Sequence, residues 1–201
     1  MQEGVYVRVK ICGLTSEGDA QFCEEMGADA LGFVHFPGRG RSMPLEEIWE
    51  ICQTLGPMVT RVLICNPGGP NEALDMLERS GVDVLQTYSL SPLFITRIRE
   101  AGARVIRAVR PDVVEARRFA DVADALVFEA GIPGTGTSYE YSSIPMGICK
   151  RSIIAGGLNP MNLEEVKKLG PYGVDVSSGV ESSLGKKDPE LVREFIRRCR
   201  N

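Results

Sequence analysis

Along the whole sequence, short runs rich in Val and Ile alternate with longer runs of helical spacing, and Gly or Pro separates most of them. The short runs are five to seven residues long and predict strands. Eight strands are expected, at residues 7–12, 30–36, 60–66, 84–88, 104–109, 125–130, 152–157 and 173–178. In most of the intervening runs, apolar residues recur every three or four positions, as on the buried face of a helix. Seven helices are expected, at residues 16–27, 44–56, 71–81, 92–102, 112–122, 159–170 and 188–199.

A chain that alternates strand and helix throughout favours a parallel sheet wrapped by helices. Eight such units in 201 residues predict an α/β fold of the closed (β/α)8 or TIM-barrel type, near the lower size limit for that fold, as one domain over residues 1–201. The connector after strand six, at 142–150, is expected to be a weak helix because it contains Pro145 and Gly147. A doubly wound open sheet is the alternative, but the first turn, GLT at 13–15, lacks the GxGxxG pattern of that fold.

The composition argues against several classes of protein. A formal net charge of −4 without a dense basic patch argues against a nucleic-acid partner bound through its phosphate backbone. Apolar runs stay well short of the roughly 18–20 residues of a membrane span. The six cysteines show no CxxC or other metal-ligand spacing. We therefore expect a reduced, cytoplasmic protein without a metal site.

Polar residues interrupt the apolar strands at their C-terminal ends, where a barrel of this kind places its active site. Lys10 and Cys12 share one face of the first strand, and Asp175 and Ser177 share one face of the last. In a closed barrel those two strands are neighbours. If the shared faces point inward, Lys10 and Asp175 are expected to form an internal ion pair.

Glycines gather at the ends of strands six, seven and eight. Loops after the last two strands of such barrels frequently bind phosphate through backbone N–H groups. Taken singly, each glycine is better explained by a tight turn; taken together, the set favours a phosphate site. The candidate phosphate-binding residues are Gly134, Gly136, Gly156, Gly157, Ser178 and Gly179.

Six motifs occur in an order that resembles the phosphoribosylanthranilate isomerase family. They are VKICGLT at 9–15, ALGFV at 30–34, VLQ at 84–86, PGTG at 133–136, AGGLNP at 155–160 and VDVSSGVE at 174–181, the last followed by KD at 187–188. The match spans nearly the whole chain, and the first and last motifs are quite specific. The resemblance implies a (β/α)8 barrel that uses neither a metal nor an organic cofactor.

The resemblance also implies a reaction and a set of residues. The family performs an Amadori rearrangement of N-(5-phosphoribosyl)anthranilate in tryptophan biosynthesis by general acid–base catalysis. The family's base is the cysteine of the KICG motif, which is Cys12 here. Its acid is the carboxylate at the end of strand six, here Glu129. The arginine that contacts the anthranilate carboxylate best matches Arg41, with Arg39 as a nearby contender.

Two departures from the family pattern leave other interpretations open. Glu129 stands where the family usually has Asp, and Tyr88 stands where it usually has His. A barrel isomerase for another aminoaldose phosphate, or a catalytically impaired phosphosugar-binding relative, are the alternatives. His35, the only histidine, is interpreted as pocket wall or packing. The sequence leaves two oligomeric states open, a monomer and a homodimer.

Overall fold

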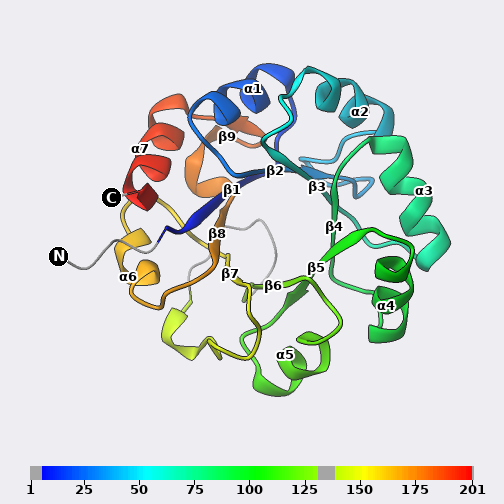
Figure 1. Ribbon diagram of the computed structural model, residues 1–201. Coiled ribbons are helices and arrows are strands. Elements are labelled where there is room, and N and C mark those ends of the chain that lie inside the picture. The colour runs from blue at the N-terminus through cyan, green and yellow to red at the C-terminus, as the bar shows by residue number, and fades with distance from the viewer. Residues whose placement is uncertain (1–5, 131–138, 201) are drawn as a thin grey trace.

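The computed structural model describes residues 6–130 and 139–200. Its centre is a closed barrel of eight parallel strands in sequence order, seen down its axis in Figure 1. The strands are β1 (Arg8–Cys12), β2 (Ala30–Val34), β3 (Thr60–Ile64), β4 (Val84–Thr87), β5 (Arg104–Val109), β6 (Ala125–Phe128), β7 (Ser152–Ile154) and β8 (Gly173–Val176). The predicted barrel is confirmed. Most predicted strands run one to three residues too far at their C-terminal ends, because those residues leave the ladder to form the mouth of the barrel.

The helices form a ring outside the barrel (Figure 1). They are α1 (Glu17–Glu25), α2 (Leu45–Thr54), α3 (Pro70–Ser80), α4 (Pro92–Glu100), α5 (Val113–Phe119), α6 (Leu163–Lys167) and α7 (Pro189–Arg200). Between β6 and β7, the described residues form only a short 3₁₀ helix, η1 (Tyr141–Ser143), which confirms the weak helix predicted there. None of the helices in the described ranges is long and apolar enough to cross a membrane.

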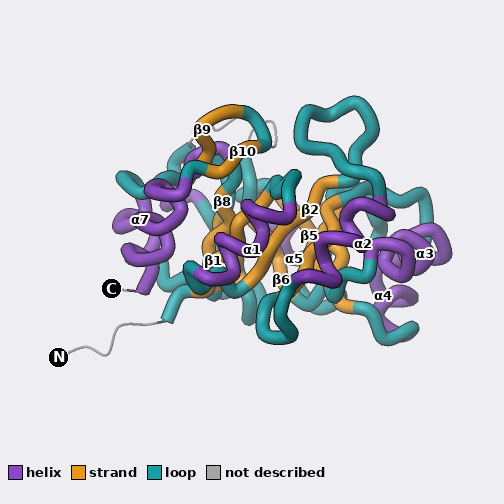
Figure 2. Tube along the Cα trace, turned by 90° about the horizontal axis from the view of Figure 1, so that it is seen from above, coloured by secondary structure: helices purple, strands orange, loops and turns teal. Residues whose placement is uncertain are grey.

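A small antiparallel hairpin follows β8 and was not predicted. It consists of β9 (Glu181–Ser183) and β10 (Lys186–Lys187), and it is preceded by the 3₁₀ helix η2 (Ser178–Val180). Figure 2 shows the hairpin standing beyond one end of the barrel strands. The run from 181 to 187 is short and mostly polar, so it lacks the concentration of Val and Ile that marks the barrel strands.

Local sequence signals place the helix ends. The Ser16 hydroxyl accepts a hydrogen bond from the Asp19 N–H at the start of α1, and the Asp112 carboxylate accepts one from Glu115 at the start of α5. Gly81 ends α3 in the left-handed conformation, with φ of +64°. Ser16 and Asp112 thus fix where their helices begin, and Gly81 turns the chain from the end of α3 back toward the barrel.

The strands bury apolar side chains on both faces, as expected for a parallel sheet covered by helices. One set of strand side chains points outward against the helices; it includes Val9, Ile11, Leu31, Phe33, Leu63, Leu85, Leu126, Phe128, Ile154 and Val174. The other set fills the interior in two clusters: Val62, Ile64 and Val84, and Ala108, Ala125, Val127, Ile153 and Ala155. Each large side chain buried in this way contributes roughly 1.5–3 kcal/mol.

Candidate active site

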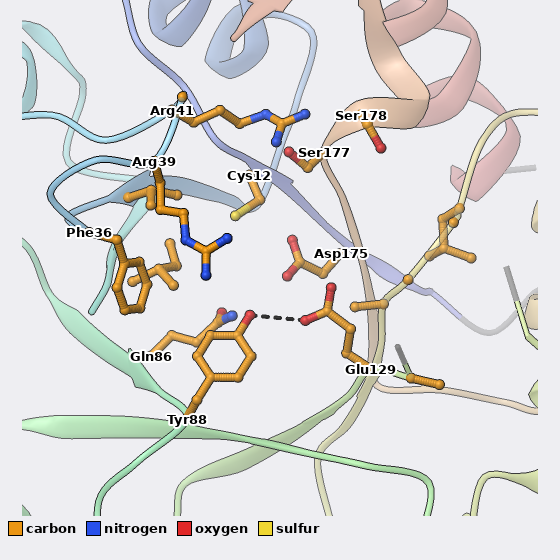
Figure 3. Close-up of a pocket in the computed structure, with 18 of the residues that line it drawn as sticks. Cys12, Phe36, Arg39, Arg41, Gln86, Tyr88, Glu129, Asp175, Ser177 and Ser178 are labelled. Carbon is orange, nitrogen blue, oxygen red and sulfur yellow. Dashed lines mark hydrogen bonds between the residues drawn. The ribbon is translucent and has the colours of Figure 1, made fainter. Parts of the chain in front are cut away.

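A cavity of about 540 Å³ lies at the C-terminal ends of the barrel strands. The polar and glycine residues that line it are Cys12, Arg39, Gly40, Arg41, Asn66, Gln86, Tyr88, Glu129, Gly156, Gly157, Asp175, Ser177 and Ser178. They come from both halves of the sequence. Figure 3 shows the thiol of Cys12, the carboxylate of Glu129 and the guanidinium of Arg39 directed into the same space. The strand ends singled out in the sequence therefore converge on one pocket.

Cys12 ends β1 beside a buried ion pair. The Nζ of Lys10 lies 2.9 Å from each carboxylate oxygen of Asp175, which confirms the predicted internal pair. Gly32, on β2, makes room for the thiol, because a Cβ there would lie 3.0 Å from the Cys12 Sγ. Burial raises the pKa of the Cys12 thiol, although the charge of Lys10 opposes the increase. Cys12 is therefore a thiol rather than a thiolate at neutral pH.

The same pair sets the charge of Lys10. Burial alone lowers the pKa of this amine, but the adjacent Asp175 carboxylate more than offsets burial, and the net pKa of Lys10 is raised. Lys10 thus stays a cation inside the barrel. Part of its charge is compensated by Asp175, so Cys12 receives only a weakened electrostatic stabilisation of its thiolate.

Glu129 follows β6 and accepts a hydrogen bond from another pocket residue. The hydroxyl of Tyr88, which follows β4, donates to the Oε2 of Glu129 over 2.9 Å (Figure 3). The backbone N–H of Tyr88 donates to the Asn66 side chain, also over 2.9 Å. Burial raises the pKa of the Tyr88 phenol, and the nearby Glu129 carboxylate adds to the increase. Tyr88 therefore remains a hydrogen-bond donor.

The two candidate arginines occupy different environments. Arg41 is held by Glu181, whose carboxylate accepts from its Nε over 2.8 Å and from its Nη2 over 2.7 Å. The Nζ of Lys187 also lies 2.8 Å from Glu181, so this carboxylate bridges two cations. Arg39 lies on the exposed loop after β2, and its guanidinium points into the cavity toward Cys12 and Asp175 (Figure 3). Both arginines line the pocket.

The glycines at the ends of strands seven and eight are required for different structural reasons. Gly156 and Gly157 have φ values of +88° and +66°, which side chains rarely adopt. Gly179 lies against the preceding loop, and a Cβ there would stand only 1.8 Å from the carbonyl oxygen of Leu158. Gly179 is not among the described residues that line the cavity. Gly134 and Gly136, the other glycines proposed for phosphate binding, lie outside the described residues.

Backbone donors are nevertheless available at this edge of the pocket. Within the described ranges, the N–H groups of Gly156, Gly157, Ser178 and Gly179 have no hydrogen-bond acceptor. Buried or half-buried backbone N–H groups normally find an acceptor. Four such groups on adjacent loops suit an anionic ligand with several oxygens.

Comparison with known proteins decides the family. The family model for N-(5'-phosphoribosyl)anthranilate (PRA) isomerase matches residues 9–198. The chain belongs to the phosphoribosylanthranilate isomerase family. The N-(5'-phosphoribosyl)anthranilate isomerase of Nitratiruptor sp. is 36% identical over 197 residues, which cover 96% of this chain and 99% of that protein.

Solved structures of family members share the fold. The phosphoribosyl anthranilate isomerase of Thermus thermophilus superposes with a TM-score of 0.88 at 36% identity, covering 96% of this chain and 98% of that one. A phosphoribosyl anthranilate isomerase in complex with reduced 1-(o-carboxyphenylamino)-1-deoxyribulose 5-phosphate gives a TM-score of 0.85 at 32% identity, with the same coverage. The near-complete coverage agrees with the motif order seen in the sequence.

Sequence reasoning missed one residue that shapes the phosphoribosylanthranilate isomerase pocket. Lys187 is 2% exposed, and its Nζ donates to the backbone oxygen of Cys12 over 2.7 Å as well as pairing with Glu181. It links the β9–β10 hairpin to the end of β1. Lys187 stood in a motif of the family, but the motif alone did not show what it contacts. His35 packs as expected, with its Nδ1 2.8 Å from the Met43 carbonyl oxygen.

Proposed function

We propose that this protein converts N-(5-phosphoribosyl)anthranilate to 1-(o-carboxyphenylamino)-1-deoxyribulose 5-phosphate, an Amadori rearrangement in tryptophan biosynthesis. The observation that carries the proposal is the convergence of Cys12 and Glu129 on one cavity, which a cationic loop and several backbone donors also line. Membership of the phosphoribosylanthranilate isomerase family supports the same conclusion. The reaction needs two proton-transfer groups and an anchor for each charged end of the substrate.

Glu129 acts as the general acid. It protonates the furanose ring oxygen, and the C1′–O bond breaks as the nitrogen lone pair forms a Schiff base. Cys12, as its thiolate, then removes the proton from C2′, and the electron pair moves through C1′ to the nitrogen. The enolamine that results tautomerises to the ketone. Glu129 is longer than Asp by one methylene, so the acid reaches further from β6 toward the centre of the pocket.

The proposed reaction needs Cys12 as a thiolate, which is not its resting form. Burial raises the pKa of this thiol, so only a small fraction is ionised at neutral pH. Lys10 favours the thiolate and lies on the same inward face of β1, while Asp175 moderates its charge. We propose that this balance lets Cys12 accept the C2′ proton as a strong base and release it again.

Different groups of the pocket hold the two charged ends of the substrate. Backbone N–H groups of Gly156, Gly157, Ser178 and Gly179 bind the phosphate, whose charge suits donors that have no acceptor among the described residues. Arg41, oriented by Glu181, binds the anthranilate carboxylate, and Arg39 supplies a second positive charge to the same group. Gly134 and Gly136 remain proposed phosphate contacts from the sequence.

Fluorescence of freshly generated N-(5-phosphoribosyl)anthranilate provides the direct test. We expect the purified protein to consume it and to restore growth of a tryptophan auxotroph lacking this isomerase. Binding of the reduced product analogue without any turnover contradicts the proposal and favours an impaired phosphosugar-binding protein. Turnover of a different aminoaldose phosphate, with none of this substrate, favours the related barrel isomerase.

A further inference from the structure

Tyr88 and Glu129 form a side-chain pair at the mouth of the barrel. They follow strands β4 and β6, which are separated by β5, and their side chains meet at 2.9 Å in the pocket. Figure 3 shows the phenol reaching from one side to one oxygen of the carboxylate, while the other oxygen points toward Asp175. Two of the positions at which this chain departs from the family pattern, Tyr88 and Glu129, are therefore in direct contact.

Tyr88 is fixed by contacts other than its bond to Glu129. Its backbone N–H donates to the Oδ1 of Asn66 over 2.9 Å. Its ring packs against Phe36 at a centroid distance of 6.5 Å, tilted by 59°. These contacts fix the position of the Tyr88 ring. Its hydroxyl can therefore restrain a more flexible hydrogen-bond partner.

Glu129 has a reason to need such a restraint. A Glu carboxyl is carried on one more rotatable bond than an Asp carboxyl, so more conformations compete with the productive one. A displacement of about 1 Å at a catalytic group can cost about 10²-fold in rate. A hydroxyl that holds one carboxyl oxygen removes much of this freedom.

We infer that Tyr88 is a positioning residue for Glu129: its hydroxyl fixes Oε2 so that the carboxyl is aimed at the ring oxygen of the substrate. The inference rests on the proposed function, since it assigns Glu129 the role of general acid. On this view the two replacements compensate for each other: the longer acid, Glu129, is paired with a longer, fixed donor, Tyr88. If Tyr88 instead bound the substrate directly, removing its hydroxyl would change KM, and the change would not depend on Glu129.

A double-mutant cycle separates these roles. The variants are Tyr88→Phe, which removes only the hydroxyl and keeps the ring against Phe36, Glu129→Asp, and the two combined. Tyr6→Phe is the matched control, because the Tyr6 hydroxyl also donates to a carboxylate, that of Asp29, over 2.6 Å at the N-terminal end of β1. Each variant is assayed for kcat and KM with N-(5-phosphoribosyl)anthranilate, and thermal unfolding checks its fold.

We expect Tyr88→Phe to lower kcat about tenfold with KM changed less than about twofold, while Tyr6→Phe leaves both unchanged. Glu129→Asp withdraws the carboxyl from Tyr88 by about 1.5 Å, one carbon–carbon bond. In that background, Tyr88→Phe is expected to change kcat less than about twofold.

Three results overturn the inference: wild-type kcat in Tyr88→Phe, an effect confined to KM, or a full tenfold loss on adding Tyr88→Phe to Glu129→Asp. If Glu129→Asp is too slow to assay, the division of the Tyr88→Phe effect between kcat and KM decides. A wild-type protein that does not consume the substrate contradicts the proposed function instead, so the two failures are distinguishable.

Discussion

Lys10 and Asp175 face each other across the seam where β1 and β8 close the barrel, with both carboxylate oxygens 2.9 Å from the lysine Nζ. Both side chains are nearly excluded from solvent, at 5% and 7% exposed. An ion pair buried this deeply adds little net stability by itself, but removing one partner strands the other charge. The pair also lies next to Cys12, so the same two residues help to close the barrel and set the electrostatic environment of the proposed base.

Lys10→Met is expected to destabilise the protein by about 3–5 kcal/mol, because Asp175 is left buried without its cation. Urea unfolding measures the change. Arg79→Met is the control, since it removes an exposed ion pair with Glu46, and stability should hardly change. The double variant Lys10→Met/Asp175→Leu should recover part of the loss. Equal instability in the single and double variants contradicts the unpaired-charge explanation.

Cys12→Ala and Glu129→Ala are each expected to reduce kcat by at least about 10²-fold, the range usual for general acid–base groups. Binding of the reduced product analogue, followed by calorimetry, should weaken far less. Cys149→Ser, whose sulfur lies 3.3 Å from the Ser152 hydroxyl, is the matched control and should keep wild-type kcat. Near-normal turnover in either alanine variant removes that residue from the proposed mechanism.

Alkylation of Cys12 by iodoacetamide is expected to accelerate with rising pH, with a midpoint above that of an ordinary cysteine thiol, because burial raises the pKa of this thiol. The thiolate is the reacting form, so the rate is low below the pKa and reaches its plateau above it. Mass spectrometry in a Cys149→Ser background follows one site, since Cys12 and Cys149 are the partly exposed cysteines of the described residues. Lys10→Met should move the midpoint higher still. A midpoint below neutrality refutes this view of the site.

Arg41→Ala is expected to raise KM for the anthranilate-bearing substrate several-fold more than it lowers kcat, because it removes a charge that binds the substrate and transfers no proton itself. Arg39→Ala should raise KM less. Initial-rate kinetics of both variants test the assignment. If Arg39→Ala raises KM and Arg41→Ala leaves it unchanged, the sequence alignment of this loop is wrong and Arg39 is the anchor.

Gly179→Ala is expected to destabilise the protein by about 1–3 kcal/mol and to weaken binding of the reduced product analogue, because the added Cβ collides with the Leu158 carbonyl. Gly18→Ala is the control. Gly18 lies in α1 with open space around it, and alanine there should stabilise by up to about 1 kcal/mol. Thermal unfolding and calorimetry compare the two. If Gly179→Ala keeps wild-type stability and analogue binding, the loops that hold Leu158 and Gly179 can separate without an energetic cost, which contradicts this explanation.

Much of the fold was predictable because it follows from neighbours along the chain. Alternating Val and Ile mark the strands, three-to-four spacing marks the helices, and Ser16 and Asp112 act as caps within their own segments. The Lys10–Asp175 pair was also predictable, since strand alternation and barrel closure together place both on one inward face. The β9–β10 hairpin was not, because its short polar run has no periodicity of its own.

The sequence by itself determined the barrel, the end of it that holds the site, and the residue types available there. Only the tertiary structure decided which of them meet: Tyr88 with Glu129, 41 positions apart, and Lys187 with Cys12, 175 positions apart. Periodicity is a property of neighbouring residues, whereas these contacts depend on strand register and on the path of each loop across the mouth of the barrel. A hydrogen bond needs placement within a few tenths of an ångström, and no local pattern specifies that.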